Sequence, residues 1–167
     1  MRLWRGTLQP GAAVGPSRRS RISRLSLEVV ATDADQHLLA RAARGCYPRG
    51  ALRELPSEWT CRAFVREHGN ECLRSAFRRG ILFLRQDIRS LQLEGPFNLV
   101  LCRNLAFTYF DARLQRRTFL DVAARMRPGA VLVVGKDEQL PDPAGFEPSP
   151  AGLGVYRKGG APSSIGA

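Results

Sequence analysis

Short runs of apolar residues, bounded by turn residues, divide the chain into candidate strands. The clearest run is Phe97 to Cys102, which follows Gly95-Pro96 and ends at the polar pair Arg103-Asn104. A continuous apolar run of this length is typical of a strand that is buried on both faces of a sheet. Similar runs predict further strands over residues 27–35, 80–84, 130–134 and 153–157.

Apolar residues at helical spacing predict the main helices. The first of them follows the strand that ends in two acids, where Asp33 or Asp35 can cap its first turn and Gly45 is a suitable stop. A longer helix is predicted from Asp111 to Met126. The order strand–helix, insertion, strand, strand–helix, strand and late strand predicts an α/β fold with a mainly parallel sheet.

The insertion is predicted over residues 71–84, after a short helix from Trp59 to His68. Two short strands, joined by the sequence Ala-Phe-Arg-Arg, are typical of a hairpin. The tip of this hairpin is basic, because it carries Arg74, Arg78 and Arg79.

Polar side chains follow three of the predicted strands, namely Asp33, Asp87 and the pair Arg103-Asn104. The carboxyl ends of parallel strands meet at one edge of a sheet, so these groups can converge on one ligand. A carboxylate after the second strand can accept hydrogen bonds from both ribose hydroxyls, and Asp87 can accept one from the exocyclic amine of adenine. Each aspartate can instead serve only as a helix N-cap.

The net charge of +11 is concentrated at the start of the chain. Residues 1–26 hold six arginines and no acid, whereas the rest of the chain carries 20 basic and 15 acidic residues. The basic stretch lacks the interleaved aromatic residues of a nucleic-acid binder, so nucleic acid is not favoured as a partner. No apolar run approaches the length of about 20 residues that a membrane span needs, so we expect no membrane insertion.

Residues 1–26 are predicted to form a disordered or atypical basic leader. Their arginine- and serine-rich composition leaves a mitochondrial transit peptide as an alternative, although Pro10 and Pro16 would interrupt its helix. The four cysteines form no C-x-x-C pair, and Cys61, His68 and Cys72 lack a fourth zinc ligand. We therefore expect free thiols in a reducing compartment, a cytoplasmic protein and no metal site.

Six segments occur in an order that resembles one enzyme family. They are Leu27-Glu-Val-Val-Ala-Thr-Asp-Ala-Asp35, Gly45-Cys-Tyr-Pro48, Leu52-Arg-Glu-Leu-Pro56, Gly95-Pro-Phe-Asn-Leu-Val-Leu-Cys-Arg-Asn104, Tyr109-Phe-Asp111 and Met126-Arg-Pro-Gly129. Together they resemble CheR-type methyltransferases, the S-adenosylmethionine-dependent enzymes that esterify glutamates of chemotaxis receptors. The resemblance covers roughly residues 27–158, and residues 159–167 are expected to be a disordered tail.

The resemblance implies a class I methyltransferase fold, a Rossmann-like sheet with S-adenosylmethionine lying across the strand exits. The cofactor-binding residues that it implies are Asp33, Ala34, Asp87, Ile88, Arg103 and Asn104. Arg103 and Tyr109 would act at the methyl-transfer site, and the hairpin with Arg74, Arg78 and Arg79 would dock a protein substrate. Such a transfer is an in-line displacement, in which the enzyme mainly positions an ionised carboxylate and excludes water.

The chain also departs from the family pattern. The first strand, with its glycine-rich loop and paired acids, should lie before Leu27 but is missing, and Met1-Arg-Leu-Trp4 could be a remnant or mimic of it. The family's helical N-terminal domain is missing too, Asp87 replaces a common Asn, and one extra residue separates Asn104 from Tyr109. We therefore expect a truncated or alternatively spliced form with weak or no activity. The alternative function is a non-catalytic protein-interaction module on the same fold; the sequence does not indicate an oligomeric state.

Overall fold

The computed structural model describes residues 2–8, 25–90, 92–150 and 152–160. The strands are β1 (Arg2–Leu8), β2 (Leu25–Asp33), β3 (Cys46–Pro48), β4 (Phe64–Glu67), β5 (Asn70–Leu73), β6 (Ile81–Arg85), β7 (Phe97–Leu101), β8 (Met126–Val133), β9 (Phe146–Pro148) and β10 (Val155–Lys158). The helices are α2 (Gln36–Arg44), α3 (Ser57–Ala63), α4 (Ala106–Tyr109) and α5 (Ala112–Ala124), with 3-10 turns η1 (Arg49–Leu52), η2 (Ser75–Phe77) and η3 (Ile88–Ser90).

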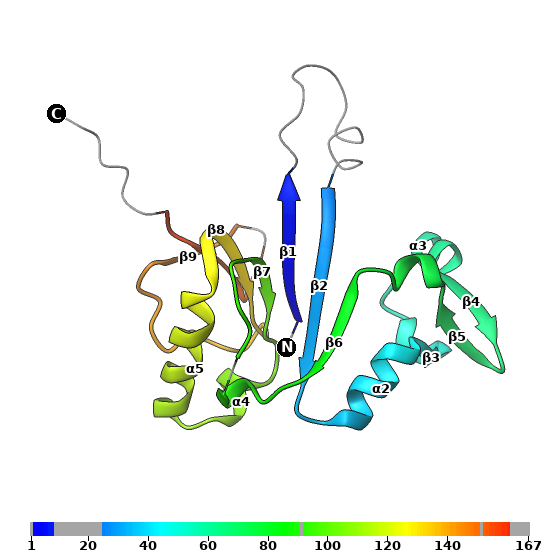
Figure 1. Ribbon diagram of the computed structural model, residues 1–167, viewed down its shortest axis with the longest axis horizontal. Helices are drawn as coiled ribbons and strands as arrows, with labels where there is room; N and C mark the ends of the chain where they lie inside the picture. Colours follow the sequence, from blue (N-terminus) through cyan, green and yellow to red (C-terminus); the bar gives the residue numbers. More distant parts are fainter. Residues whose placement is uncertain (1, 9–24, 91, 151, 161–167) are drawn as a thin grey trace, which may run out of the picture.

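Within this described part, a large sheet has the strand order β6-β2-β1-β7-β8-β10-β9. Its pairings make β2, β6, β7, β8 and β9 run in one direction, with β1 and β10 running against them. Figure 1 shows α5 beside β7 and β8, and α2 toward the other end of the sheet with the small sheet next to it. The predicted α/β class is confirmed, but the expected mainly parallel sheet is wrong: among the described strands only β2–β6 and β7–β8 pair in parallel, because β1 and β10 run against their neighbours.

Strand β1 occupies the middle of the large sheet, between β2 and β7. It is antiparallel to both neighbours, since Arg2 pairs with Ala31 on one side and with Leu101 on the other. Without it, the facing N–H and C=O groups of β2 and β7 would lack ladder partners. Residues 2–8 of the predicted leader therefore form a strand, whereas residues 9–24 lie outside the described residues.

The predicted helix boundaries follow from capping residues. The Asp35 carboxylate accepts a hydrogen bond from the His37 N–H at the start of α2, and Gly45 ends this helix with a left-handed φ of 65°. At the start of α5, the Asp111 carboxylate accepts from the Leu114 N–H at 2.8 Å. These side chains supply the acceptors that the first N–H groups of a helix otherwise lack.

The main core lies between α5 and the sheet. Val100 of β7 and Leu132 of β8 are fully buried, and Phe119 of α5 is 2% exposed. The Phe119 ring packs edge-on against Phe146 of β9, with 5.2 Å between ring centroids. This cluster packs the carboxyl ends of β7 and β8 against each other.

The predicted hairpin over residues 71–84 is wrong. Strand β5 pairs with β4 and β3 in a separate three-stranded sheet, and its hairpin turn lies at His68-Gly69, where both residues have positive φ. The predicted helix from Trp59 to His68 is correspondingly too long, because α3 ends at Ala63 and the next residues form β4.

Strand β6, the second half of the predicted hairpin, instead pairs in parallel with β2 in the large sheet. It is an edge strand of that sheet, in which Ile81, Phe83 and Leu84 are half-buried and Leu82 is exposed. Arg74, Arg78 and Arg79 therefore flank η2, on the connection between the two sheets, and not a hairpin tip.

The expectation of free thiols is wrong for two of the cysteines. Cys46 and Cys72 face each other across β3 and β5 and form a disulfide. Cys61 is free and exposed, and Cys102 is free and buried. The Glu67 carboxylate lies close to the disulfide, within 4.8 Å, but both sulfurs are already bonded to each other.

Candidate cofactor site

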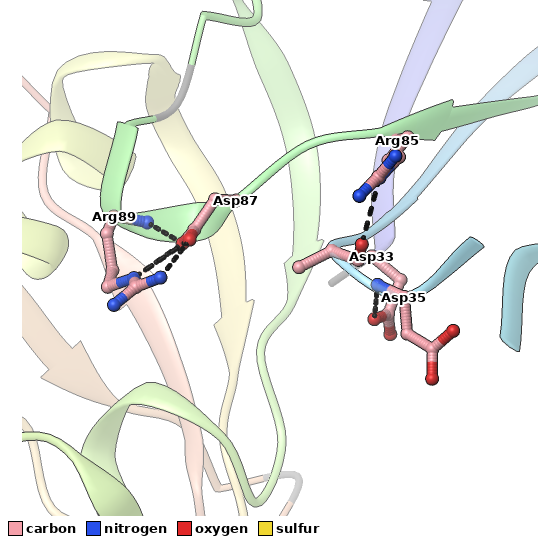
Figure 2. Close-up of polar contacts among 6 residues, drawn as sticks. Asp33, Asp35, Arg85, Asp87 and Arg89 are labelled. Carbon is pink, nitrogen blue, oxygen red and sulfur yellow. Dashed lines mark hydrogen bonds and ion pairs between the residues drawn. The ribbon is translucent and has the colours of Figure 1, made fainter. Parts of the chain in front are cut away.

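The carboxyl ends of β2, β6 and β7 meet at one edge of the large sheet and enclose a cavity of about 220 Å³. The cavity is lined by Thr32, Asp33, Ala34, Gln86, Asp87, Ile88, Arg89, Leu105 and Phe110. Four of the six predicted cofactor-binding residues, Asp33, Ala34, Asp87 and Ile88, thus lie together. Figure 2 shows Asp33 and Asp87 where the neighbouring strands β2 and β6 end.

Asp33 is half-buried at the end of β2. Its Oδ1 accepts a hydrogen bond from the Asp35 N–H at 3.0 Å, and its Oδ2 has no partner among the described residues. The Asp33 carbonyl accepts from the Gln86 N–H, which ties the exits of β2 and β6 together. A second tie comes from Arg85, whose Nε donates to the Ala34 carbonyl at 3.2 Å (Figure 2). The free Oδ2 can accept hydrogen bonds from a ligand.

Asp87 is paired with Arg89 in the same wall of the cavity (Figure 2). Its carboxylate accepts from the Arg89 N–H at 2.9 Å, from Nε at 2.8 Å to Oδ2, and from Nη2. Hydrogen bonds from the Arg89 side chain, and then from its backbone N–H, hold the pKa of Asp87 below its usual range. Three donors therefore fill most of the roughly four acceptor positions that a carboxylate offers.

A third acceptor in the cavity wall comes from Gln86, which the sequence did not single out. Its Oε1 is buried and has no hydrogen-bond partner among the described residues. A buried carbonyl oxygen without a partner costs free energy, so such an atom is a natural acceptor for a ligand donor.

Arg103, Asn104 and Tyr109 lie outside the lining of this cavity. Arg103 is exposed at the end of β7, and Tyr109 is 75% exposed on α4. Asn104 has a positive φ of 50°, and its Oδ1 lies against Gly135, where a Cβ atom would overlap it. The structure therefore brings these three residues to the same edge of the sheet but not into the cavity.

The exit of β8 carries a buried acid, Glu138, that sequence reasoning missed. Its carboxylate is 7% exposed and accepts from the N–H groups of Asn104 (2.8 Å), Leu105 (3.2 Å) and Gly135, and from Oγ1 of Thr108 (2.6 Å). Burial alone raises the pKa of Glu138, but these four hydrogen bonds outweigh it and lower the pKa below its usual range. The signal was a polar residue after the strand at 130–134, the same signal that identified Asp33 and Asp87.

The predicted docking arginines are exposed. Arg74 and Arg78 line a hollow of about 530 Å³ beside the disulfide, together with Arg44, and Arg79 does not. Arg78 donates from Nη1 to the Arg44 carbonyl at 3.1 Å, so its guanidinium is held near the end of α2.

The sheet, its helices and its edge cavity fit a Rossmann-like α/β domain, and comparison with known proteins identifies the family. The model of the CheR methyltransferase, SAM binding domain, matches residues 16–152. The chain therefore belongs to the CheR methyltransferase family, as its sequence predicted, and S-adenosylmethionine is the cofactor of that domain family.

The curated relatives include several chemotaxis protein methyltransferases. That of Listeria monocytogenes is 31% identical over 119 residues, which cover 71% of this chain and 45% of the relative. Chemotaxis protein methyltransferase 2 of Vibrio cholerae is 26% identical over 124 residues (72% and 43%), and the Klebsiella aerogenes protein is 29% identical over 128 residues (69% and 41%). The chain thus spans less than half the length of these relatives. In the described residues, no helix is long and apolar enough to cross a membrane.

Proposed function

We propose that this domain binds S-adenosylmethionine at the carboxyl edge of the sheet and transfers its methyl group to a glutamate carboxylate of a protein. The observation that carries the proposal is the convergence of acceptor atoms from Asp33, Gln86 and Asp87 on one cavity. Membership of the CheR family supplies the identity of the cofactor.

The residues present fit an adenosine group. Its ribose offers two hydroxyl donors, and its adenine offers an exocyclic amine, which match the carboxylates of Asp33 and Asp87 and the unpartnered Gln86 Oε1. Ile88, Leu105 and Phe110 supply apolar surface for the faces of the base. Arg89 already occupies most of the acceptor positions of the Asp87 carboxylate. The adenine amine would therefore share this carboxylate with Arg89.

The bound cofactor supplies an electrophilic methyl group on a sulfonium sulfur. The acceptor carboxylate is ionised at neutral pH, so the protein needs no strong base and contributes mainly positioning and exclusion of water. In this proposal Arg103, exposed at the end of β7, attracts the acceptor carboxylate, and Tyr109 lies on the acceptor side. In such a transfer a C–O bond to the acceptor would form as the C–S bond breaks, and the electron pair of that bond would stay on sulfur.

The methionine end of the cofactor would have fewer partners here than the family pattern provides. Strand β1, which lies beside β2 in the sheet, runs antiparallel to both of its neighbours, and residues 1–26 contain no glycine-rich loop with paired acids. We therefore expect weak cofactor binding, dominated by contacts to the adenosine group.

Titration calorimetry with S-adenosylhomocysteine tests the proposal. We expect saturable binding by the wild type and an affinity at least about tenfold lower for Asp33→Asn, since a hydrogen bond to a charged group contributes about 1.5–3 kcal/mol. Glu54→Gln, which removes a carboxylate whose side chain is 87% exposed, is the matched control and should bind normally. Transfer of a labelled methyl group to candidate acceptor proteins then tests catalysis. Binding without transfer would favour the non-catalytic interaction module instead.

The exposed arginines on the connection between the sheets are proposed to dock the protein substrate. Arg74 and Arg78 share one hollow, and their positive charge suits an acidic partner. Arg74→Glu should raise the KM for the acceptor protein and leave S-adenosylhomocysteine binding unchanged. An unchanged KM in steady-state labelling assays would refute this docking role.

A further inference from the structure

The Glu138 carboxylate is saturated by protein donors. Oε2 accepts from the N–H groups of Asn104 and Gly135, and Oε1 accepts from the Leu105 N–H and from Thr108 Oγ1. Two carboxylate oxygens offer about four acceptor positions, and all of them are used. A buried carboxylate in this state cannot also accept a proton or a hydrogen bond from a substrate. Its role must therefore be exerted through the groups that it binds.

These groups belong to two different strand exits. Gly135 follows β8, and the turn from Gly135 to Glu138 is closed by a hydrogen bond from the Glu138 N–H to the Gly135 carbonyl at 3.0 Å. Asn104, Leu105 and Thr108 follow β7, about 30 residues earlier in the chain. Glu138 thus joins the β7 exit to the β8 exit through one side chain.

The β7 exit needs such support because its backbone is unusual. Asn104 has a φ of 50°, a left-handed conformation that is uncommon for non-glycine residues and that asparagine adopts more readily than most of them. The next N–H, that of Leu105, points at the same carboxylate, so that two successive N–H groups share one anion. Gly135 makes the contact possible, since a Cβ there would stand 2.8 Å from Glu138 Oε2.

The segment that Glu138 supports contains two residues of the candidate site. Leu105 lines the cavity with Asp33 and Asp87, and Arg103 immediately precedes the left-handed residue. We propose that Glu138 is a positioning residue for the transfer step: it fixes the β7 exit so that Leu105 closes the cavity and Arg103 faces the acceptor. This inference rests on the proposed function.

The first test measures the turn itself. Glu138→Gln keeps the shape of the side chain but replaces one acceptor oxygen with an NH₂ donor that faces protein donors. Hydrogen exchange of the Asn104 and Leu105 amides should become at least about tenfold faster in this variant, because both amides lose a charged acceptor. Glu147→Gln on β9 removes an exposed carboxylate and should leave the exchange of these amides unchanged.

The second test measures catalysis per binding site. Asp33 and Gln86, the hydrogen-bonding anchors for the adenosine group, are untouched, and only the apolar contact of Leu105 loosens. Glu138→Gln should therefore keep its S-adenosylhomocysteine stoichiometry and change its KM for S-adenosylmethionine less than about threefold, while kcat per binding site falls at least about tenfold. Thr108→Val, which removes one of the four donors, should give an intermediate fall. Partial unfolding would instead lower the stoichiometry and leave kcat per binding site unchanged.

The outcomes separate the two proposals. Wild-type protein that does not bind S-adenosylhomocysteine refutes the proposed function, and the exchange measurement alone then decides whether Glu138 holds the turn. Unchanged exchange at Asn104 and Leu105, or an unchanged kcat per binding site in Glu138→Gln, overturns the positioning role. Wild-type protein that binds the cofactor product but transfers no methyl group also overturns it.

Discussion

The carboxyl edge of the sheet has two halves, the exits of β2 and β6 and the exits of β7 and β8, which differ in whether their acceptor oxygens have hydrogen-bond partners. At the exits of β2 and β6, Asp33 Oδ2 and Gln86 Oε1 have no partner among the described residues, and both residues line a cavity. At the exits of β7 and β8, the Glu138 carboxylate is buried and accepts four hydrogen bonds from the protein. A free acceptor indicates a ligand site, whereas a saturated one indicates a structural support for that site.

Removing the saturated acid should have the largest effect on stability. Glu138→Ala leaves three backbone N–H groups and the Thr108 hydroxyl without their acceptor, and each buried group left unpaired costs about 1–3 kcal/mol. We expect the free energy of unfolding in urea to fall by about 3 kcal/mol or more. Asp33→Ala, at the ligand half of the edge, should lower it by less than about 1 kcal/mol. Equal losses for both variants would contradict the comparison.

The same acid should make stability depend on pH. The pKa of Glu138 is lowered in the folded protein, so its contribution is complete above the unfolded pKa of about 4.3 and is lost as the pH falls through the lower folded value. Urea midpoints measured between about pH 6 and about pH 3 should therefore fall more steeply for the wild type than for Glu138→Gln. Parallel curves would show that other carboxylates account for the acid sensitivity.

Two buried side-chain oxygens of the described residues, Gln86 Oε1 and Thr118 Oγ1, have no hydrogen-bond partner and should respond differently to removal. Thr118 Oγ1 lies in the α5 core, away from the cavity, so Thr118→Val should raise the free energy of unfolding by about 1 kcal/mol without affecting ligand binding. Gln86→Met should be neutral or stabilising too, but should weaken S-adenosylhomocysteine binding several-fold. Calorimetry and urea unfolding of both variants test this, and normal binding by Gln86→Met would remove Gln86 from the site.

The smallest effect is expected at the exposed Asp87–Arg89 pair. The Arg89 side chain is 61% exposed, and ion pairs of this kind contribute at most about 1 kcal/mol. Arg89→Leu frees acceptor positions on Asp87, so S-adenosylhomocysteine should bind about two- to fivefold more tightly. Weaker binding by this variant would show that Arg89 orients Asp87 for the base and does not compete with it.

Local signals in the sequence were sufficient to predict several helix ends and the acids at the exits of β2 and β6. Caps at Asp35, Gly45 and Asp111 mark helix ends through side-chain or glycine chemistry that needs no distant partner. Asp33 and Asp87 were predicted together because strand direction alone brings the carboxyl ends of parallel strands to one edge.

The misses all depend on partners that are distant in sequence. Strand β1 is defined by pairing with β2 and β7, and its own residues carry no strand signal distinct from the basic leader. Residues 64–67 were predicted to end the helix from Trp59 to His68, yet pairing with β5 makes them a strand. The Cys46–Cys72 disulfide spans 26 residues with no characteristic spacing, and three of the four donors to Glu138 lie about 30 residues before it.

The central claim is that the β2–β6 half of the edge is the cofactor site of this CheR-family domain. Calorimetric titration of S-adenosylhomocysteine into the wild type, Asp33→Asn and Glu54→Gln tests it most directly. We predict saturable binding by the wild type and by Glu54→Gln, with an affinity at least about tenfold lower for Asp33→Asn. No saturable binding by the wild type, or equal binding by Asp33→Asn, would contradict it.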